Sequence, residues 1–220
     1  MEHQTSSPTS FPSAKELFRA VEAGDVARVR QFVLRDRTLA NARTEQGCSA
    51  VLHAMNQRQA EVAADLVLCG ASLDIHEAAA TGHIERLEEL VTLDASCLWS
   101  CSAEGWTPLH LAAFFGQKRA VAFLLERGTP VAAWSKNSLP SQPLHAAVAG
   151  NDAEVCRLLL ERGAPADEKQ HGGFRPLHGA AEPLLGVLDA VARCASDSPL
   201  WLESRTLAGT PHLGCRPEGP

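Results

Sequence analysis

Apolar residues in the middle of the chain recur in pairs of short helical stretches, each followed by a glycine. Residues 107–115 carry one apolar face, residues 119–127 carry a second, and Gly116 and Gly128 follow them. This spacing predicts two amphipathic helices that pack against each other. Glycine after each helix favours a left-handed turn, because a residue without a Cβ adopts it most easily. Helices this short cannot bury their apolar faces alone, so the pattern predicts a stack of such pairs.

The first helix of this unit carries two further start signals. Thr107 precedes Pro108, and a threonine side chain can accept a hydrogen bond from a free backbone N–H as N-cap. Proline suits the first helical position because its missing N–H would have no partner there. We therefore expect a helix that begins at Pro108 and is capped by Thr107.

Copies of this unit occur along most of the chain. Aligned on the Thr107 position, they start near Lys15, Ser49, Leu73, Thr107, Gln142 and Arg175. The intervals between starts, by subtraction, are 34, 24, 34, 35 and 33 residues. The tetrapeptide Thr-Pro-Leu-His at 107–110 recurs as Pro-Leu-His at 143–145 and 176–178. The period and the motif together resemble the ankyrin repeat family.

The resemblance covers roughly residues 15–181 and implies an all-α fold. The expected architecture is an α-solenoid of about six helix pairs, joined by outward hairpin loops, with the last pair degenerate. We expect the repeat domain at 14–195, between a disordered Ser, Thr and Pro-rich leader at 1–13 and an irregular or disordered tail at 196–220. In this family the hairpin tips and the concave surface bind other proteins.

The second interval is ten residues shorter than the first, by subtraction of 24 from 34. Residues 70–74 join the second unit directly to the third and leave no room for a hairpin loop. We expect a gap in the row of hairpins at this junction. The gap either changes the local curvature of the stack or is a neutral deletion.

Two later units differ from the 107–128 unit at their helix ends. Gln142 and Arg175 are poor N-caps, so the helices that follow them should fray more readily than the helix after Thr107. Asn151 stands where Gly116 stands in the earlier unit. Asparagine tolerates the left-handed conformation, although the adjacent Gly150 could form this turn instead.

The formal net charge of −6 is unevenly distributed. Residues 48–106 hold 2 arginines and 9 acidic residues, a net charge of −7, so the remaining residues sum to +1. A nucleic-acid-binding protein needs a basic surface to neutralise phosphates, which argues against a nucleic-acid partner. An acidic centre favours a basic protein partner.

Cellular location is inferred from what the sequence does not contain. The N-terminus lacks the basic and apolar segments of a signal peptide, and no apolar run approaches the length of a membrane-spanning helix. Seven cysteines at irregular spacing indicate free thiols in a reducing compartment. We expect a cytoplasmic monomer with no membrane partner.

Histidines at equivalent positions of the units are the main candidates for chemistry. They are His76, His110, His145 and His178. Successive copies would lie about 10 Å apart, one helix-pair spacing, which is too far to share a metal ion. In ankyrin-like repeats this histidine bonds backbone groups near the hairpin and links neighbouring repeats. We expect that structural role here.

Other residue patterns do not assemble into an active site. Cys97 and Cys101 have no second ligand pair with the spacing of a zinc site. Free thiols are the first interpretation of this pair, and a reversible disulfide is the alternative. The sequence offers no nucleophile in a glycine-flanked elbow, so we expect no enzyme, no cofactor and no metal.

The expected partner-binding residues follow from the resemblance, position by position. In ankyrin-like stacks the hairpin tips and the last turn of each first helix face the groove. In this sequence the selected positions are Glu104, Trp106, Phe114, Phe115, Trp134, Lys136, Asn137, Gln170, His171 and Phe174. Large rigid aromatic rings desolvate well and act as binding hot spots. The alternative is that Trp106, Phe114 and Phe115 pack between neighbouring repeats.

Two functional hypotheses remain at this point. The first is a non-catalytic protein–protein interaction module that binds a partner through its hairpin tips and groove. The second is an adaptor, or an inhibitory or regulatory subunit of an enzyme complex, in which Trp201 and Leu202 of the tail supply a second contact.

Overall fold

The computed structural model describes residues 13–170, 173 and 175–176. Within this part the chain is helical, with one isolated antiparallel bridge between Arg43 and Ser49. The elements are α1 (Ala14–Glu22), α2 (Val26–Arg35), the 3-10 helix η1 (Arg37–Asn41), α3 (Ala50–Asn56), α4 (Ala60–Leu68), α5 (Ile75–Thr81), α6 (Ile84–Leu93), the 3-10 helix η2 (Ala95–Trp99), α7 (Pro108–Phe114), α8 (Lys118–Glu126), α9 (Pro143–Gly150) and α10 (Ala153–Glu161). Residues 1–12 of the predicted leader, the tail and almost all of the sixth unit lie outside the described residues.

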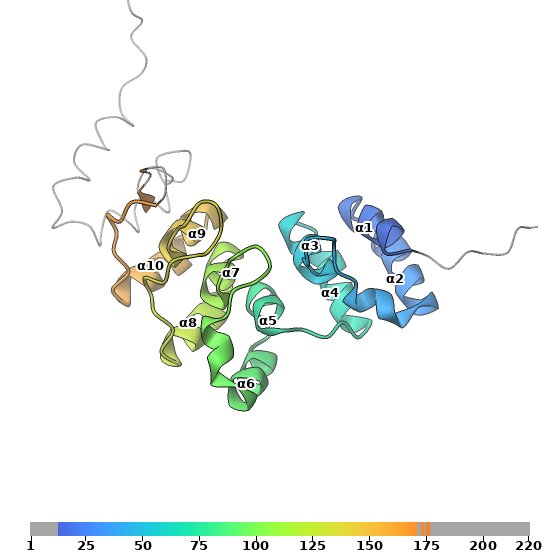
Figure 1. Ribbon diagram of the computed structural model, residues 1–220, viewed down its shortest axis with the longest axis horizontal. Coiled ribbons are helices and arrows are strands. Elements are labelled where there is room, and N and C mark those ends of the chain that lie inside the picture. Colours follow the sequence, from blue (N-terminus) through green and yellow to red (C-terminus); the bar gives the residue numbers. More distant parts are fainter. Residues whose placement is uncertain (1–12, 171–172, 174, 177–220) are drawn as a thin grey trace, which may run out of the picture.

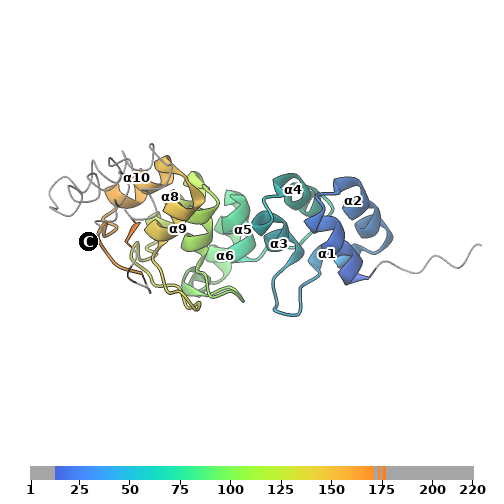
Figure 2. The same ribbon diagram turned by 90° about the horizontal axis from the view of Figure 1, so that it is seen from above.

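The helices form two rows that run along the long axis of the molecule (Figures 1 and 2). Helices α1, α3, α5, α7 and α9 pack side by side as the inner row, and each outer helix from α2 to α10 follows and packs on its inner partner. The hairpins that precede the inner helices project on one side of the stack (Figure 2). This arrangement confirms the predicted solenoid of helix pairs.

One apolar core runs through the stack, and each pair contributes fully buried leucines or other aliphatic residues to it. Leu17, Leu66, Leu87, Leu109 and Leu124 are completely covered. Burying a leucine side chain stabilises a fold by about 1.5–3 kcal/mol. Each inner helix packs against the next inner helix along the row, so this core is shared between adjacent units.

The predicted glycine turns are confirmed. Gly116 and Gly128 have φ values of 69° and 86°, in the left-handed region. Asn151 takes the same conformation at φ 63°, so asparagine and not Gly150 makes the fifth-unit turn. Gly150 has a different role, because a Cβ there would overlap the carbonyl oxygen of Phe114. A glycine at this position lets α9 approach α7 closely.

Two helices are capped by residues other than those the sequence predicts. Helix α1 is capped by Ser13, two residues before the expected start at Lys15. Helix α5 is capped by Asp74, one residue after the expected start at Leu73, because the Asp74 carboxylate accepts hydrogen bonds from the N–H groups of His76 and Glu77. An alignment on a fixed register misses the residue with the better capping side chain.

The expected cap at Thr107 is wrong in its detail. Helix α7 begins at Pro108 as predicted, yet the Thr107 side chain makes no cap hydrogen bond. Its Oγ1 lies 2.7 Å from Nδ1 of His110 instead. The hydroxyl group therefore orients a buried histidine and leaves the first turn without a side-chain cap.

The short interval between the second and third units removes a hairpin, as predicted. Residues 69–74 connect α4 to α5 without the extended loop that precedes α3, α7 and α9. The inner row continues from α3 to α5, but the outer helices α4 and α6 are not packed side by side. In Figure 1 α6 points away from α4, so the stack changes direction at this junction.

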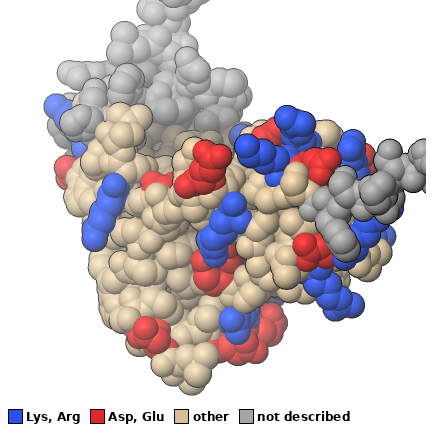
Figure 3. Space-filling model, turned by 45° about the vertical axis from the view of Figure 1, so that its right-hand side comes forward, with Lys and Arg blue, Asp and Glu red and all other residues tan. Residues whose placement is uncertain are grey.

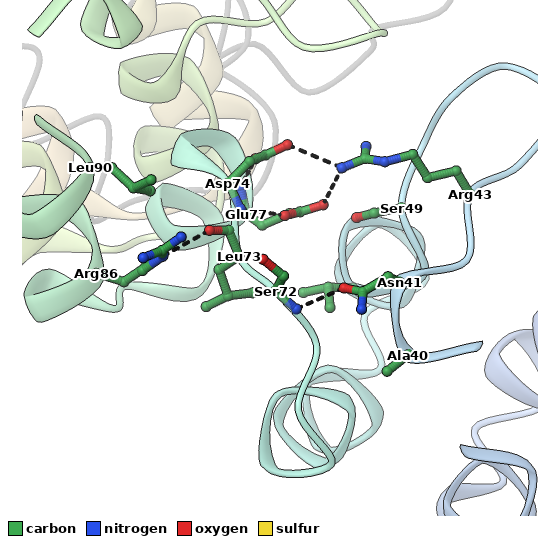
Figure 4. Close-up of a pocket in the computed structure, with 11 residues that line it drawn as sticks. Ala40, Asn41, Arg43, Ser49, Ser72, Leu73, Asp74, Glu77, Arg86 and Leu90 are labelled. Atoms are coloured by element: carbon green, nitrogen blue, oxygen red, sulfur yellow. Dashed lines mark hydrogen bonds and ion pairs between the residues drawn. The ribbon is translucent and has the colours of Figure 1, made fainter. Parts of the chain in front are cut away.

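Polar side chains bridge this junction where the hairpin is missing (Figure 4). One Nη atom of Arg43 lies 3.3 Å from a carboxylate oxygen of Asp74 and 3.3 Å from one of Glu77. The Asn41 side chain accepts a hydrogen bond of 2.7 Å from the Ser72 N–H, and Arg86 donates one of 3.0 Å to the Leu73 carbonyl. Together they line a cavity of about 350 Å³. The contacts of Arg43 and Asn41 hold the third unit to the second, and the Arg86 bond fixes the linker against α6.

The neighbouring hairpins also close over the gap. Ala103, in the fourth-unit hairpin (residues 100–106), lies next to Gly47 of the second-unit hairpin (residues 42–48). A second apolar cluster forms below them from side chains of three units. Its buried members are Cys48, Leu52, Ala80 and Leu111, and Trp106 and Phe115 pack against it. Leu52 thus fills, with an apolar side chain, the position where other units carry histidine.

Candidate protein-binding surfaces

The turns between inner and outer helices form a surface pocket of about 350 Å³, here called the groove pocket. It spans the ends of α3, α7 and α9. Its lining residues are Met55, Asn56, Arg58, Ala60, Phe114, Phe115, Gly116, Gln117, Gly150, Asn151 and Asp152. The pocket therefore joins the second unit to the fourth and fifth.

Phe114 and Phe115 form the aromatic wall of the groove pocket. Their rings meet edge to face with centroids 5.0 Å apart. Both side chains are half-buried, Phe114 against the main core and Phe115 against the second apolar cluster. Phe114 and Phe115 therefore both pack between units and line the pocket, so the two interpretations of these residues are compatible. The packed side fixes the rings in place, and the other side lines the pocket.

Glu104 and Trp106 lie in the fourth-unit hairpin, apart from the groove-pocket lining. Glu104 is exposed, and its Oε1 accepts a hydrogen bond of 3.1 Å from Nδ2 of Asn56, a groove-pocket residue. Trp106 is half-buried between the two apolar clusters, with its ring centroid 5.4 Å from that of His110. These two residues join the hairpin to the helices beneath it.

A second, more apolar pocket lies near the other end of α7 and is here called the tryptophan cleft. Its volume is about 120 Å³. The lining residues are Leu98, Trp99, Cys101, Thr107, Leu109, Thr129, Pro130, Ala133, Trp134 and Lys136. Trp99 is 52% exposed and Trp134 is 44% exposed, which is unusual for residues that gain so much from burial.

Trp99 is the residue that sequence reasoning missed, although the register of the repeats contains a signal for it. Trp134 follows Trp99 by 35 residues (134 − 99), the same interval that separates Gln142 from Thr107 (142 − 107). The two rings therefore occupy equivalent positions in consecutive units. A comparison of equivalent positions along whole units, and not of hairpin tips alone, would have found the pair.

The remaining predicted residues are distributed as follows. Lys136 is exposed and lines the tryptophan cleft. Asn137 is half-buried, and its Oδ1 accepts a hydrogen bond of 3.1 Å from the Ser135 hydroxyl. Gln170 is half-buried and lines neither pocket. His171 and Phe174 lie outside the described residues, as does His178.

The histidines act as links between units, as predicted for His110. Its Nε2 lies 2.9 Å from the Ser141 carbonyl oxygen of the next unit, to which it donates a hydrogen bond, and Nδ1 accepts from the Thr107 hydroxyl. Burial, together with the nearby His145, lowers the pKa of His110 to about 4, against the opposing effect of the Ser141 carbonyl. A neutral imidazole with both nitrogens occupied is a structural group and offers no free base.

His76 makes a looser version of the same link. Its Nε2 lies 3.3 Å from the Ser100 hydroxyl of the following unit. In the fifth unit, Nδ1 of His145 accepts a 3.3 Å hydrogen bond from the backbone N–H of Gln142. Each of these histidines thus bonds groups near a hairpin.

Residues 13–170 contain no group of three or more His, Cys, Asp or Glu side chains that could hold a metal ion. The five cysteines in this part of the chain, which include Cys97 and Cys101, are all free. No helix among the described residues is long and apolar enough to cross a bilayer.

Charged side chains are interspersed over much of the face seen in Figure 3. Acidic side chains are seen at the lower edge of that view. Helix α6 exposes three acidic residues, Glu85, Glu88 and Glu89. The acidic centre of the sequence thus includes the outer face of α6, away from both pockets.

Comparisons with known proteins agree with the architecture. A family model of three ankyrin repeat copies matches residues 52–137, and a single ankyrin repeat model matches residues 142–170. A search of curated proteins found no match.

Among solved structures, the crystal structure of the ankyrin repeat domain of Bcl-3, described as a unique member of the IkappaB protein family, superposes with a TM-score of 0.50. The sequences are 24% identical, and the match covers 81% of this chain and 85% of that chain. At this identity the likeness shows the fold alone. The family models cover more than half of the sequence, and ankyrin repeats are generally protein–protein interaction modules. This chain belongs to the ankyrin repeat family.

Proposed function

We propose that this chain is a non-catalytic protein-binding module and that the groove pocket is its main recognition site. The observation that carries the proposal is the pair Phe114 and Phe115, which are fixed on one side by packing and line a surface pocket of about 350 Å³ on the other. Rigid aromatic side chains at the centre of a contact are the usual source of binding energy between proteins.

The rim of the groove pocket supplies polar groups for orientation. Asn56, Arg58 and Gln117 present both hydrogen-bond donors and acceptors around the aromatic wall. An apolar centre with a polar rim is the anatomy of a specific protein interface. A partner would insert one or two apolar side chains between the rings and Met55, and bond the rim with its backbone.

The proposed setting follows from the same residues. We place the module in the cytoplasm as a monomer. The location is supported by the five cysteines of the described residues, which are all free, whereas an oxidising compartment would favour their pairing. The proposed role involves no catalysis, since the buried histidine His110 is bonded at both nitrogens.

An adaptor role is the second candidate, and one observation favours it. The tryptophan cleft and the groove pocket share no residue and lie at opposite ends of α7. A helix of seven residues is about 10 Å long, so two partners that approach from different sides can bind together. The proposed tail contact through Trp201 and Leu202 lies outside the described residues.

Site-specific photo-cross-linking tests the main proposal. With p-benzoylphenylalanine in place of Phe115, the full chain should cross-link to a discrete protein in a cell extract. The same probe in place of Glu88, on the outer face of α6, is the control and should not yield that product. Phe114→Ala in the Phe115 probe protein should weaken the cross-link. Equal products from both positions, or none from Phe115, would contradict the proposal.

A further inference from the structure

We propose that the tryptophan cleft binds an extended, proline-containing segment of a partner protein that carries an acidic residue next to the proline. This surface is separate from the groove pocket, so the inference does not rest on the function proposed above. It rests on four observations: the equivalent positions of two tryptophans, the rigid backbone next to them, the size of the cleft, and the charge of Lys136.

The two rings are placed one repeat apart. Trp99 and Trp134 occupy equivalent positions in consecutive units and line the same cleft. Packed helices lie about 8–10 Å apart, and carbon atoms in contact lie about 3.5–4.0 Å apart. Two rings that line one cleft from units at this spacing can therefore both touch one inserted apolar group.

Hydrogen bonds hold the backbone next to both rings. Ser135, next to Trp134, is 3% exposed, and its N–H donates a 3.0 Å bond to the Ser141 carbonyl. The Lys136 N–H donates a 2.7 Å bond to the carbonyl of Gly105 in the preceding hairpin.

That contact between hairpins needs glycine. A Cβ on Gly105 would lie 2.6 Å from the backbone of Lys136 and Asn137. On the other side of the cleft, Leu98 is buried directly before Trp99, and the Ser100 hydroxyl donates a 2.7 Å bond to the Cys97 carbonyl. A cleft with prearranged walls loses little conformational entropy when a ligand binds.

The size of the cleft selects the form of the ligand. An apolar cavity of about 150 Å³ is large enough for a benzene ring, so 120 Å³ takes one medium apolar side chain and not the face of a helix. Extended polyproline segments dock between aromatic rings in this way, because their backbone is already ordered before binding. Leu98, Leu109, Pro130 and Ala133 give the floor an apolar character that suits a proline ring.

Lys136 determines the charge of the ligand. It supplies the one charged side chain among the described residues that line the cleft, and it forms no ion pair with another described residue. Its ammonium group at the rim can pair with a carboxylate of the bound segment. The same charge disfavours a basic segment, which gives the cleft selectivity.

Peptide binding to the full chain tests the proposal by fluorescence anisotropy. The probe is a fluorescein-labelled peptide, Ala-Pro-Pro-Leu-Pro-Asp-Asp-Ala, and two companions replace its aspartates by lysines or its prolines by alanines. We expect saturable binding of the first peptide with a dissociation constant below about 1 mM. Both companions should bind more weakly.

Three variants identify the surface. Trp134→Ala should weaken binding of the acidic peptide by about tenfold, as expected for an anchoring aromatic residue. Lys136→Glu should weaken the acidic peptide by about two- to fivefold and strengthen the lysine peptide to a similar extent. Leu139→Ala changes an exposed apolar residue of the same hairpin outside the cleft and should have no effect. Circular dichroism checks that all three fold alike.

The Lys136→Glu variant distinguishes a loss of recognition from a loss of folding, because a misfolded variant would not bind the lysine peptide more tightly. Three results would overturn the proposal. They are absence of saturable binding, equal affinity of the acidic and lysine peptides, or self-association of the chain in sedimentation that Trp134→Ala abolishes. The last result would assign the cleft to a second copy of this chain.

Discussion

Asn56 Nδ2 donates a hydrogen bond of 3.1 Å to Glu104 Oε1 and thereby joins the second unit to the fourth, past the third. In an uninterrupted stack a hairpin of the third unit would separate these residues. The gap instead lets the fourth-unit hairpin reach back to the end of α3. The second apolar cluster under the hairpins, with Leu52, Ala80 and Leu111 from three units, fills the space below.

We predict that this bond orders the fourth-unit hairpin more than it stabilises the whole domain. Both residues are exposed, so Glu104→Ala should cost no more than about 1 kcal/mol in unfolding free energy. Amide hydrogen exchange in residues 100–106 should nevertheless accelerate, because the hairpin can then open locally without breaking the bond to Asn56. Glu45→Ala, at the exposed tip of the second-unit hairpin, is the control and should leave exchange in 100–106 unchanged. Unaltered exchange in Glu104→Ala would show that the other contacts of the hairpin, such as the bond from the Lys136 N–H to the Gly105 carbonyl, are enough to hold it.

Features that depend on local chemistry and spacing can be predicted from the sequence. The period, the glycine turns and the missing hairpin all follow from residues close together in the chain, and Gly116 and Asn151 adopt the expected conformations. The bond between Asn56 and Glu104 could not be predicted, because it depends on where the fourth-unit hairpin lies relative to the end of α3 once the third hairpin is absent.

Two groups compete for the Thr107 hydroxyl, the backbone N–H groups of α7 and the His110 ring, and this competition explains why the predicted cap is wrong. The sequence predicts that Thr107 caps α7, but its hydroxyl group bonds the buried His110 instead. The local pattern fits both outcomes equally well. Only the packing that buries the histidine beside it decides between them, because a buried imidazole nitrogen without a hydrogen-bond partner is costly.

Gly150→Ala should destabilise the domain by about 1–3 kcal/mol, the usual cost of forcing extra atoms into a packed contact. The new methyl group would overlap the carbonyl oxygen of Phe114, where α9 approaches α7. Because Phe114 lines the groove pocket, partner binding should weaken as well. Urea unfolding followed by circular dichroism measures the loss of stability.

Gly128→Ala is the matched control for this substitution. Gly128 has a left-handed φ of 86°, and no atom lies within 4 Å of the position that an added methyl group would take. Its replacement costs only backbone strain, about 1–2 kcal/mol, and should leave partner binding unchanged. Weaker binding in Gly128→Ala than in Gly150→Ala would contradict the role of the close helix contact.

Cys48 and Cys156 should resist alkylation in the native protein. Burial, with a smaller effect of nearby Glu104 for Cys48 and Asp152 for Cys156, raises the pKa of both thiols to about 12 from the ordinary 9.0. Only the thiolate reacts, so a pKa rise of this size slows reaction about a thousandfold near pH 8. Iodoacetamide labelling read by peptide mass spectrometry, in buffer and in urea, checks this ratio. Similar rates in both conditions would indicate that the two sites open readily.

His110 should make the domain sensitive to acid. Burial lowers its pKa to about 4 in the folded protein, whereas an unfolded histidine titrates near 6.5. The unfolded chain therefore binds a proton first as the pH falls. The stability that the neutral imidazole provides is fully present above pH 6.5 and is lost as the pH falls through about 4.

For this difference in pKa between the folded and unfolded states, the free energy of unfolding falls by about 3 kcal/mol on acidification. NMR titration of the His110 ring should show no protonation above pH 5, and urea unfolding at several pH values should show falling stability between pH 6.5 and 4. Other groups also titrate in this range, so His110→Gln supplies the reference. The variant should be less stable at pH 7.5, because a Gln side chain does not reproduce both bonds, yet its stability should fall less on acidification. Parallel pH profiles for the two proteins would show that another group causes the acid sensitivity, and would remove His110 from its proposed role as a neutral link between the fourth and fifth units.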